Sequence, residues 1–169
     1  MLKKVDNFTK LALGDCIGQE QPPWKLTSLT MTSYGLFAGV CNNETRRNSR
    51  LYRYTDAGQL MIVHEGDSET IGQGVESKGY VGFAGENGHL LLYYNGAVFQ
   101  GMPLQYSTTC VVWQGLPCVI NTTNDTIKVI NVVNQRVEWT LPGDGIVMSA
   151  VDYHGQLFAA VADGRNRNG

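Results

Sequence analysis

The chain has 169 residues, of which 43% are hydrophobic, with 20 glycines, 5 prolines and a formal net charge of −2 at pH 7. This length predicts a single domain, residues 1–169, with its own hydrophobic core, and the composition excludes a disordered chain. The slightly acidic balance argues against a nucleic-acid partner. Membrane insertion is not expected, because no apolar run reaches the roughly 18 residues that a spanning helix needs.

The N-terminal residues contain two short stretches typical of strands, 3–8 and 10–13. A signal peptide is not expected here, because Asp6 and Asn7 interrupt the apolar residues at once. Trp24, which follows Pro22 and Pro23, is expected to seal the start of the first repeat described below.

A unit of two apolar strands joined by a tight turn occurs four times along the chain. The four copies span residues 28–40, 74–85, 110–120 and 147–161. Each has a glycine in its turn, and these glycines are Gly35, Gly79, Gly115 and Gly155. A repeat of about 40 residues in a strand-rich sequence is typical of four-stranded propeller blades.

Two more strands follow each of the first three units. They alternate apolar and polar residues, as strands half exposed to water do. In the second repeat Asn95-Gly96 separates them, and this pair is the strongest short hairpin signal, because both residues tolerate positive φ. The expected strands are 50–54 and 59–64, then 89–94 and 97–100, then 126–132 and 136–141.

We therefore expect an all-β fold, a β-propeller of four-stranded antiparallel blades. Three blades are predicted at about 27–65, 74–104 and 109–141, and the fourth combines 146–164 with residues 1–14. Joining both termini in one blade would remove free sheet edges. Two alternatives stay open: the chain is a piece of a larger propeller, or several chains pool their blades into one ring.

The blades resemble those of kelch-like and WD-like propellers in architecture over about residues 27–164. The signatures of those families are absent, since there is no Gly-His…Trp-Asp pair and no double glycine ends the second strand. The Ser-x-Asp-x-Gly box of sialidase blades is absent too. The resemblance implies a fold, and no functional residue is carried over from these families.

The four cysteines predict neither a metal site nor a redox motif. Cys16, Cys41, Cys110 and Cys118 form no C-x-x-C pair and have no histidine cluster near them, so reduced and buried thiols are expected. A Cys110–Cys118 bridge is the alternative, although the expected hairpin places the two residues diagonally. No metal and no cofactor is expected.

Binding is expected at the longer loops, which join the second strand of a blade to the third. In such a meander these loops and the blade-to-blade connections open on one side of the molecule, and the tight turns on the other. Loops held by a rigid scaffold commonly carry binding sites. The candidate binding residues are Asn42, Asn43, Glu44, Arg46, Arg47, Asn87, Asn124 and Asp125.

Other polar and aromatic residues are weaker candidates. Glu65, Asp67, Glu69 and Asp144 form no metal-loop spacing, but they are the carboxylates that an axial acid–base pair would use. The histidines His64, His89 and His154 fall in different repeats and predict no catalytic triad. Aromatic residues recur at the tight turns, at Tyr34, Trp113 and Tyr153, where blade packing and sugar stacking are equally good interpretations.

The function predicted from these patterns is that of a non-catalytic binding or assembly module. The composition, poor in lysine and rich in Asn, Thr, Gln and Gly, resembles virion structural or adhesion proteins, notably bacteriophage tail components. The expected partner is a protein or a cell-surface glycan, and a homo-oligomer or larger assembly is compatible with the repeat. The alternative is a propeller enzyme with an axial carboxylate or metal site, acting on glycosides or lactones. The sequence leaves the enzyme question open, favours a non-enzyme, and does not predict a cellular location.

Overall fold

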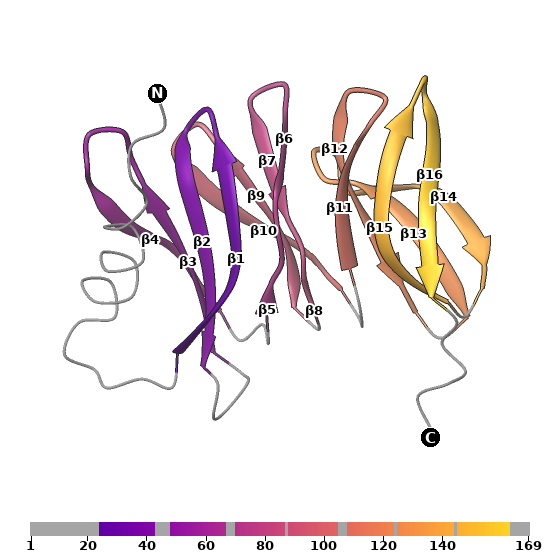
Figure 1. The fold of residues 1–169 in the computed structure, drawn as a ribbon, viewed down its shortest axis with the longest axis horizontal. Coiled ribbons are helices and arrows are strands. Elements are labelled where there is room, and N and C mark those ends of the chain that lie inside the picture. The colour runs from indigo at the N-terminus through magenta and orange to yellow at the C-terminus, as the bar shows by residue number, and fades with distance from the viewer. Residues whose placement is uncertain are drawn as a thin grey trace.

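The computed structural model describes residues 24–42, 48–66, 70–86, 88–104, 108–123, 125–143 and 145–162, and all its regular elements are strands (Figure 1). The strands are β1 (Trp24–Thr32), β2 (Gly35–Asn42), β3 (Ser49–Tyr54), β4 (Leu60–Gly66), β5 (Thr70–Ile71), β6 (Val75–Ser77), β7 (Tyr80–Phe83), β8 (Gly85–Glu86), β9 (His89–Tyr94), β10 (Ala97–Pro103), β11 (Thr108–Trp113), β12 (Leu116–Thr122), β13 (Thr126–Asn131), β14 (Arg136–Pro142), β15 (Ile146–Tyr153) and β16 (Gln156–Ala162).

Three four-stranded antiparallel sheets follow one another along the chain, as the sequence predicts. They are β1-β2-β3-β4, then β6-β7-β9-β10, then β11-β12-β13-β14, and a two-stranded sheet β15-β16 comes last. A short antiparallel pair is formed by β5, which precedes β6 in the sequence, and β8, which follows β7. Over the described residues no sheet closes on itself. The prediction of an all-β fold of four-stranded sheets is therefore confirmed, whereas the ring remains a prediction.

The tight turns form because their residues accept positive φ. The pairs Lys78-Gly79, Asn95-Gly96, Gln114-Gly115 and His154-Gly155 all have φ between 48° and 89°. Two consecutive residues with positive φ define the hairpin turn whose twist matches that of the flanking strands. The first sheet uses another geometry, in which Gly35 has φ 109°.

The hydrophobic core consists of layers between consecutive sheets. Between the first and second sheets, Phe37 and Leu51 pack with Phe83 and Tyr93, and the rings of Phe37 and Tyr93 lie 4.9 Å apart. Between the second and third sheets, Val119 and Ile130 pack with Leu90 of β9 and with Ala84, which follows β7. A third layer joins Val111 and Val129 to Val147 of β15. The second and third sheets therefore each use one face toward the preceding sheet and the other toward the following one.

A row of hydrogen bonds joins the first turn of each sheet to the first turn of the next. Tyr34 Oη donates to the Gly79 carbonyl over 2.6 Å, Ser77 Oγ donates to Gly115, and Trp113 Nε1 donates to Gly155 over 3.1 Å. We call this row the turn seam. It assigns two of the repeated turn aromatics, Tyr34 and Trp113, to contacts between sheets.

Carboxylates reinforce the turn seam at two of its three steps. The Ser33 backbone N–H and hydroxyl donate to the Glu76 carboxylate, and the Gln114 N–H donates to Asp152 over 2.8 Å. At both steps the carboxylate lies two residues before the turn of the following sheet. Equivalent contacts at equivalent positions show that the sheets stack by one repeated geometry.

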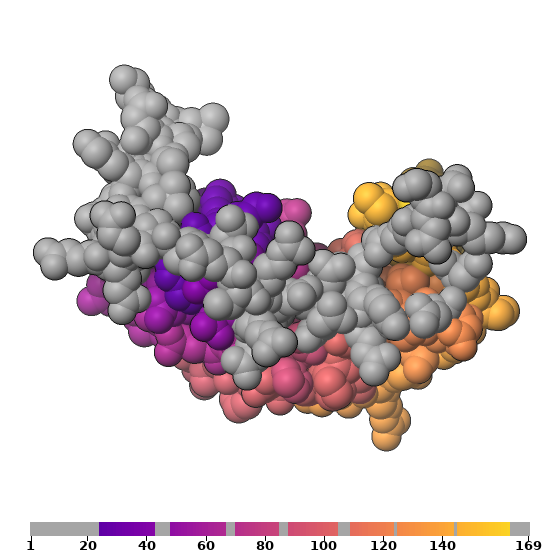
Figure 2. All heavy atoms as spheres, turned by 90° about the horizontal axis from the view of Figure 1, so that it is seen from below, coloured from indigo at the N-terminus to yellow at the C-terminus, as the bar shows by residue number. Residues whose placement is uncertain are grey.

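The stacked sheets follow a curved path, with β1–β4 at one end and the β15–β16 hairpin at the other (Figure 2). The residues expected to complete the fourth blade, 1–14 and 163–164, lie outside the described residues. In the described part of the chain, no helix has the length and apolarity that membrane crossing requires.

Replacing Gly79 by alanine should destabilise the protein by about 1–2 kcal/mol, because the residue has φ 80° and an L-residue resists this conformation. The added Cβ would meet nothing closer than the Tyr34 hydroxyl at 3.4 Å, so backbone strain is the main cause. Urea denaturation gives the free energy of unfolding. Gly143→Ala is the matched control, with ordinary φ and only van der Waals neighbours, and equal losses in both variants would contradict the assignment.

Trp113→Phe should cost about 0.5–1.5 kcal/mol, because phenylalanine keeps an aromatic ring but cannot donate to the Gly155 carbonyl. Trp139→Phe on β14 is the control, since that indole is 46% exposed and takes no part in the turn seam. Thermal unfolding of both variants compares them. A melting temperature unchanged in Trp113→Phe would show that the bond from Trp113 to Gly155 contributes nothing to stability.

Candidate binding surface

The two sides of the stack differ in what they expose. The turns between the first and second strands lie on one side, at the top of Figure 1, and the connections between sheets lie on the other. On the second side, which we call the loop side, Trp24, Arg50 and Glu65 converge on the first sheet. We call this group the Trp24–Arg50–Glu65 site.

The Arg50 guanidinium is the centre of this site. Its carbon lies 4.5 Å from the centroid of the Trp24 ring, and its Nε donates to Glu65 Oε1 over 2.6 Å. The three side chains line a hollow of about 370 Å³ together with Asn48, Ser49 and Gly66. Partial burial lowers the pKa of Arg50, but hydrogen bonds to Tyr52 and Glu65 outweigh it, so the net shift is upward and the cation persists.

Strand register places these residues on one face of the first sheet. Arg50 on β3 is directly opposite Glu65 on β4 and opposite Val40 on β2, which in turn pairs with Leu26 on β1. Because side chains alternate between faces along a strand, Trp24 lies on the same face as Leu26. An exposed carboxylate, a fixed cation and an aromatic ring can together bind a polar ligand.

The site adjoins the connection between β2 and β3, which carries most of the candidate binding residues predicted from the sequence. Asn42 is half-buried at the end of β2, and its N–H donates to the Asn48 carbonyl over 2.8 Å, which joins the two ends of that loop. Asn43, Glu44, Arg46 and Arg47 lie outside the described residues. The loop therefore begins and ends beside the Trp24–Arg50–Glu65 site.

Asp125, the other candidate binding residue that the structure describes, does not join this group. Asp125 is exposed between the third sheet's inner and outer strands, and its carbonyl accepts a hydrogen bond from Gly143 N–H. Asn87 and Asn124 lie outside the described residues, as do the carboxylates Asp67, Glu69 and Asp144. Glu65, the fourth of those carboxylates, pairs with Arg50 on outer strands rather than with another acid.

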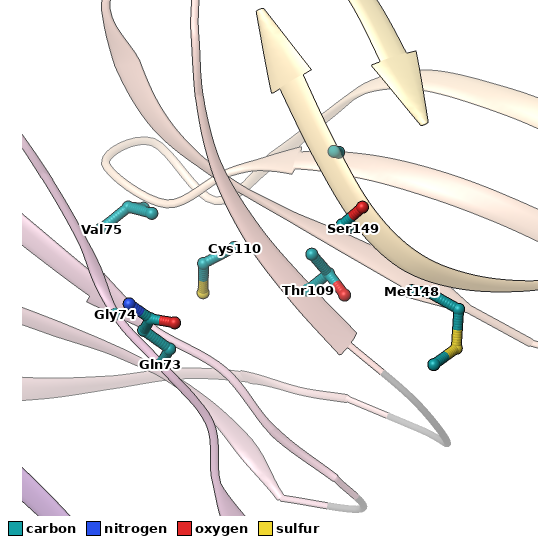
Figure 3. Close-up of a pocket in the computed structure, with 8 residues that line it drawn as sticks. Gln73, Gly74, Val75, Thr109, Cys110, Met148 and Ser149 are labelled. Atoms are coloured by element: carbon teal, nitrogen blue, oxygen red, sulfur yellow. The ribbon is translucent and has the colours of Figure 1, made fainter. Parts of the chain in front are cut away.

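A second hollow of about 370 Å³ opens between the first strands of three sheets, lined by Gly74, Thr109, Cys110 and Ser149 among others. Figure 3 shows the Cys110 thiol between β11 and the segment that contains Gly74. Burial raises the pKa of Cys110 to about 12, so its thiol is protonated at neutral pH. The hollow therefore offers hydroxyl and backbone groups to a ligand but no thiolate nucleophile.

The cysteine predictions can be compared with the structure at three positions. Cys41, Cys110 and Cys118 carry reduced thiols. Cys110 pairs with Val119 and Cys118 with Val111, so the two cysteines are diagonal neighbours in the hairpin and project to opposite faces. Cys110 contacts the layer toward the second sheet and Cys118 the layer toward β15, which excludes a bridge in this register.

Two of the three histidines, His64 and His89, lie near each other. Burial lowers the pKa of His64, and the nearby charge of His89 lowers it further, although Glu65 opposes both. His154 occupies a tight turn on the opposite side, with φ 53°. Among the described residues no group of three or more His, Cys, Asp or Glu side chains is arranged to hold a metal ion.

Comparisons with known proteins identify the fold alone. No protein-family model matches the chain, and no curated protein matches it. Among solved structures, it is similar to the computationally designed Ika4 protein, with a TM-score of 0.61 and 14% identity, over 87% of this chain and 91% of that one. At this identity the likeness concerns the arrangement of the strands and carries no information about activity.

Cys110 and Cys118 should resist alkylation by iodoacetamide at pH 8 in the folded protein. The thiolate is the reactive form, and burial raises the pKa to about 12 for Cys110 and about 11 for Cys118. Peptide mass spectrometry after timed labelling measures each site, and labelling in 8 M urea (about the concentration that unfolds most small domains) is the control. Rapid labelling of both without denaturant would contradict the described burial.

Proposed function

We propose that the protein is a non-catalytic binding and assembly module of the β-propeller type, which presents the loop side to a protein or glycan partner. The observation that carries the binding role is the Trp24–Arg50–Glu65 site beside the 43–47 loop. It combines an aromatic ring, a fixed cation and a carboxylate on a rigid sheet. Guanidinium groups give directional donors to carboxylates and sugar oxygens, and Arg46 and Arg47 add two more to the adjoining loop.

The two terminal faces of the stack support the propeller ring. Within the described residues no sheet precedes the first sheet and none follows the β15–β16 hairpin, and apolar side chains are exposed on the faces that would meet. Met31 is 75% exposed on the first sheet, and Tyr153 is 63% exposed on the hairpin. Joining the two faces would repeat the internal packing and cover both, as a closed propeller does.

The same reasoning fits a structural or adhesion role in a virion, which the polar, strand-rich composition suggested. Exposed apolar faces of this kind promote association. The enzyme alternative requires convergent acid and base groups, and no observation on the described residues favours it. Binding and assembly are therefore the roles that we propose.

The experiment that tests the binding role replaces both Arg46 and Arg47 by serine. Binding to an array of acidic glycans, read by fluorescence and followed by titration of the best ligand, should weaken about tenfold or more, which corresponds to about 1.4 kcal/mol. The melting temperature should stay unchanged, because single charges outside the strands generally contribute little to stability.

Arg136→Ser is the matched control, because Arg136 is an exposed arginine at the opposite end of a sheet, next to a strand turn. It should bind like the original protein. Equal weakening by the control variant would assign the effect to net charge. Binding that depends on Tyr34, Trp113 or Tyr153 instead would move the interaction to the turn side and overturn the placement.

A further inference from the structure

The last sheet is incomplete at one particular edge. In the three complete sheets, the second strand pairs with an outer strand: β2 with β3, β7 with β9, and β12 with β13. β16 is the second strand of the last sheet, and within the described residues it pairs with β15 only. Its other edge presents a row of backbone donors and acceptors, which readily accept an added strand.

An apolar groove of about 480 Å³ runs beside this edge, lined by Trp113, Trp139, Leu157 and Phe158, with Glu138. Trp139 pairs with the buried Val129, so it faces the same side of the third sheet as the layer that holds Val147. Trp139 is nevertheless 46% exposed. Part of the layer between the third and the last sheet is therefore uncovered.

The first layer of the stack shows what fills the equivalent space. There Val63 of β4 and Val98 of β10 pack against the same buried cluster, so outer strands of both sheets contribute. In the layer beyond the third sheet, the outer strands β13 and β14 have only the two-stranded hairpin beside them. The groove lies where the outer strands of the last sheet would pack.

The order of connections along the chain indicates which segment fits. The fourth strand of each complete sheet leads into the first strand of the next: β4 precedes β6, β10 precedes β11, and β14 precedes β15. The segment before β1 would repeat this connection if it formed the outer strands of the last sheet. Third strands have six residues in all three sheets, and the stretch 3–8, which is expected from the sequence to be strand-like, has the same length.

Charge and polarity agree with this occupant. The groove carries the Glu138 carboxylate among apolar side chains, and the segment combines Lys3, Lys4 and Lys10 with apolar residues. The apolar residues are Val5, Phe8, Leu11 and Leu13. Opposite charges on the two partners favour and orient the encounter.

We propose that the free edge of β16 and the groove beside it are the docking site for residues 3–13 of the same chain. Residues 3–8 add to β16 as its outer neighbour, and Phe8, Leu11 or Leu13 enter the groove against Trp139. Docking within one molecule is favoured over exchange between copies, because a linked segment has a high effective concentration. The inference rests on the blade architecture proposed above and is independent of any ligand on the loop side.

Hydrogen exchange on the full chain, read by mass spectrometry, tests this docking. The amides of β16 should exchange about as slowly as those of β12, which is paired on both edges. In the variant Val5→Pro/Leu11→Pro the segment loses two backbone donors and its strand geometry, so β16 should exchange about tenfold faster or more. Gln19→Pro, outside the docking residues, should behave like the original protein.

The remaining outcomes overturn the proposal. If β16 of the unmodified chain exchanges as fast as an unpaired edge, the segment does not dock, whatever the proline variant does. A protein that is dimeric by light scattering and loses β16 protection on dilution would assign the site to a second copy. Protection that appears only when an oligosaccharide is added would make the groove a glycan site. The variant Arg46→Ser/Arg47→Ser tests glycan binding and should not change the hydrogen exchange of β16. Either proposal can therefore fail without the other.

Discussion

The packing of one sheet face against the next is the interaction on which the rest of this structure depends. Each complete sheet carries apolar side chains on both faces, so a single sheet in water would expose both of them. Val81, Val119 and Val132 are fully buried between consecutive sheets, and burying a side chain of this size contributes about 1.5–3 kcal/mol. The layers therefore supply stability that no isolated hairpin has.

The turn seam fixes how these faces meet. Apolar packing alone is not directional and would tolerate sliding of one sheet on another. The donors of Tyr34, Ser77 and Trp113 each reach a turn carbonyl of the following sheet, and the Glu76 and Asp152 carboxylates hold the turns themselves. The acceptor carbonyls of Gly79, Gly115 and Gly155 occupy equivalent turn positions, so each sheet is joined to the next by the same type of contact. The curved path of the stack in Figure 2 is compatible with the proposed ring.

The same packing separates the paired strands of the molecule from the connections between them. The strands and short turns are held on both sides, whereas the loop side carries the connections between strands and sheets. The Trp24–Arg50–Glu65 site uses both: its side chains stand on paired strands, and the adjoining loop begins at Asn42, whose N–H is bonded to Asn48. A binding module gains from this arrangement, since preorganised side chains lose little conformational entropy when a ligand binds.

Strands and turns could be predicted from the sequence because they are local. Asn95-Gly96 and Lys78-Gly79 encode their turns through φ preferences of neighbouring residues, and alternation within six or seven residues encodes a strand. From these signals follow the all-β class and the four-stranded sheets. The diagonal placement of Cys110 and Cys118 followed as well, because a tight turn fixes the register of its hairpin.

Only the tertiary structure decided which distant side chains meet. Trp24 was expected to seal the first repeat, and Glu65 was one of four dispersed carboxylates, yet both converge on Arg50. That contact depends on the pairing of four strands and on the face to which each residue points. The assignment of Tyr34 and Trp113 to the turn seam likewise required knowing which sheet lies beside which. Local preferences determine the strands one at a time, whereas register and stacking depend on free energy shared by the whole core, which no short stretch of sequence encodes.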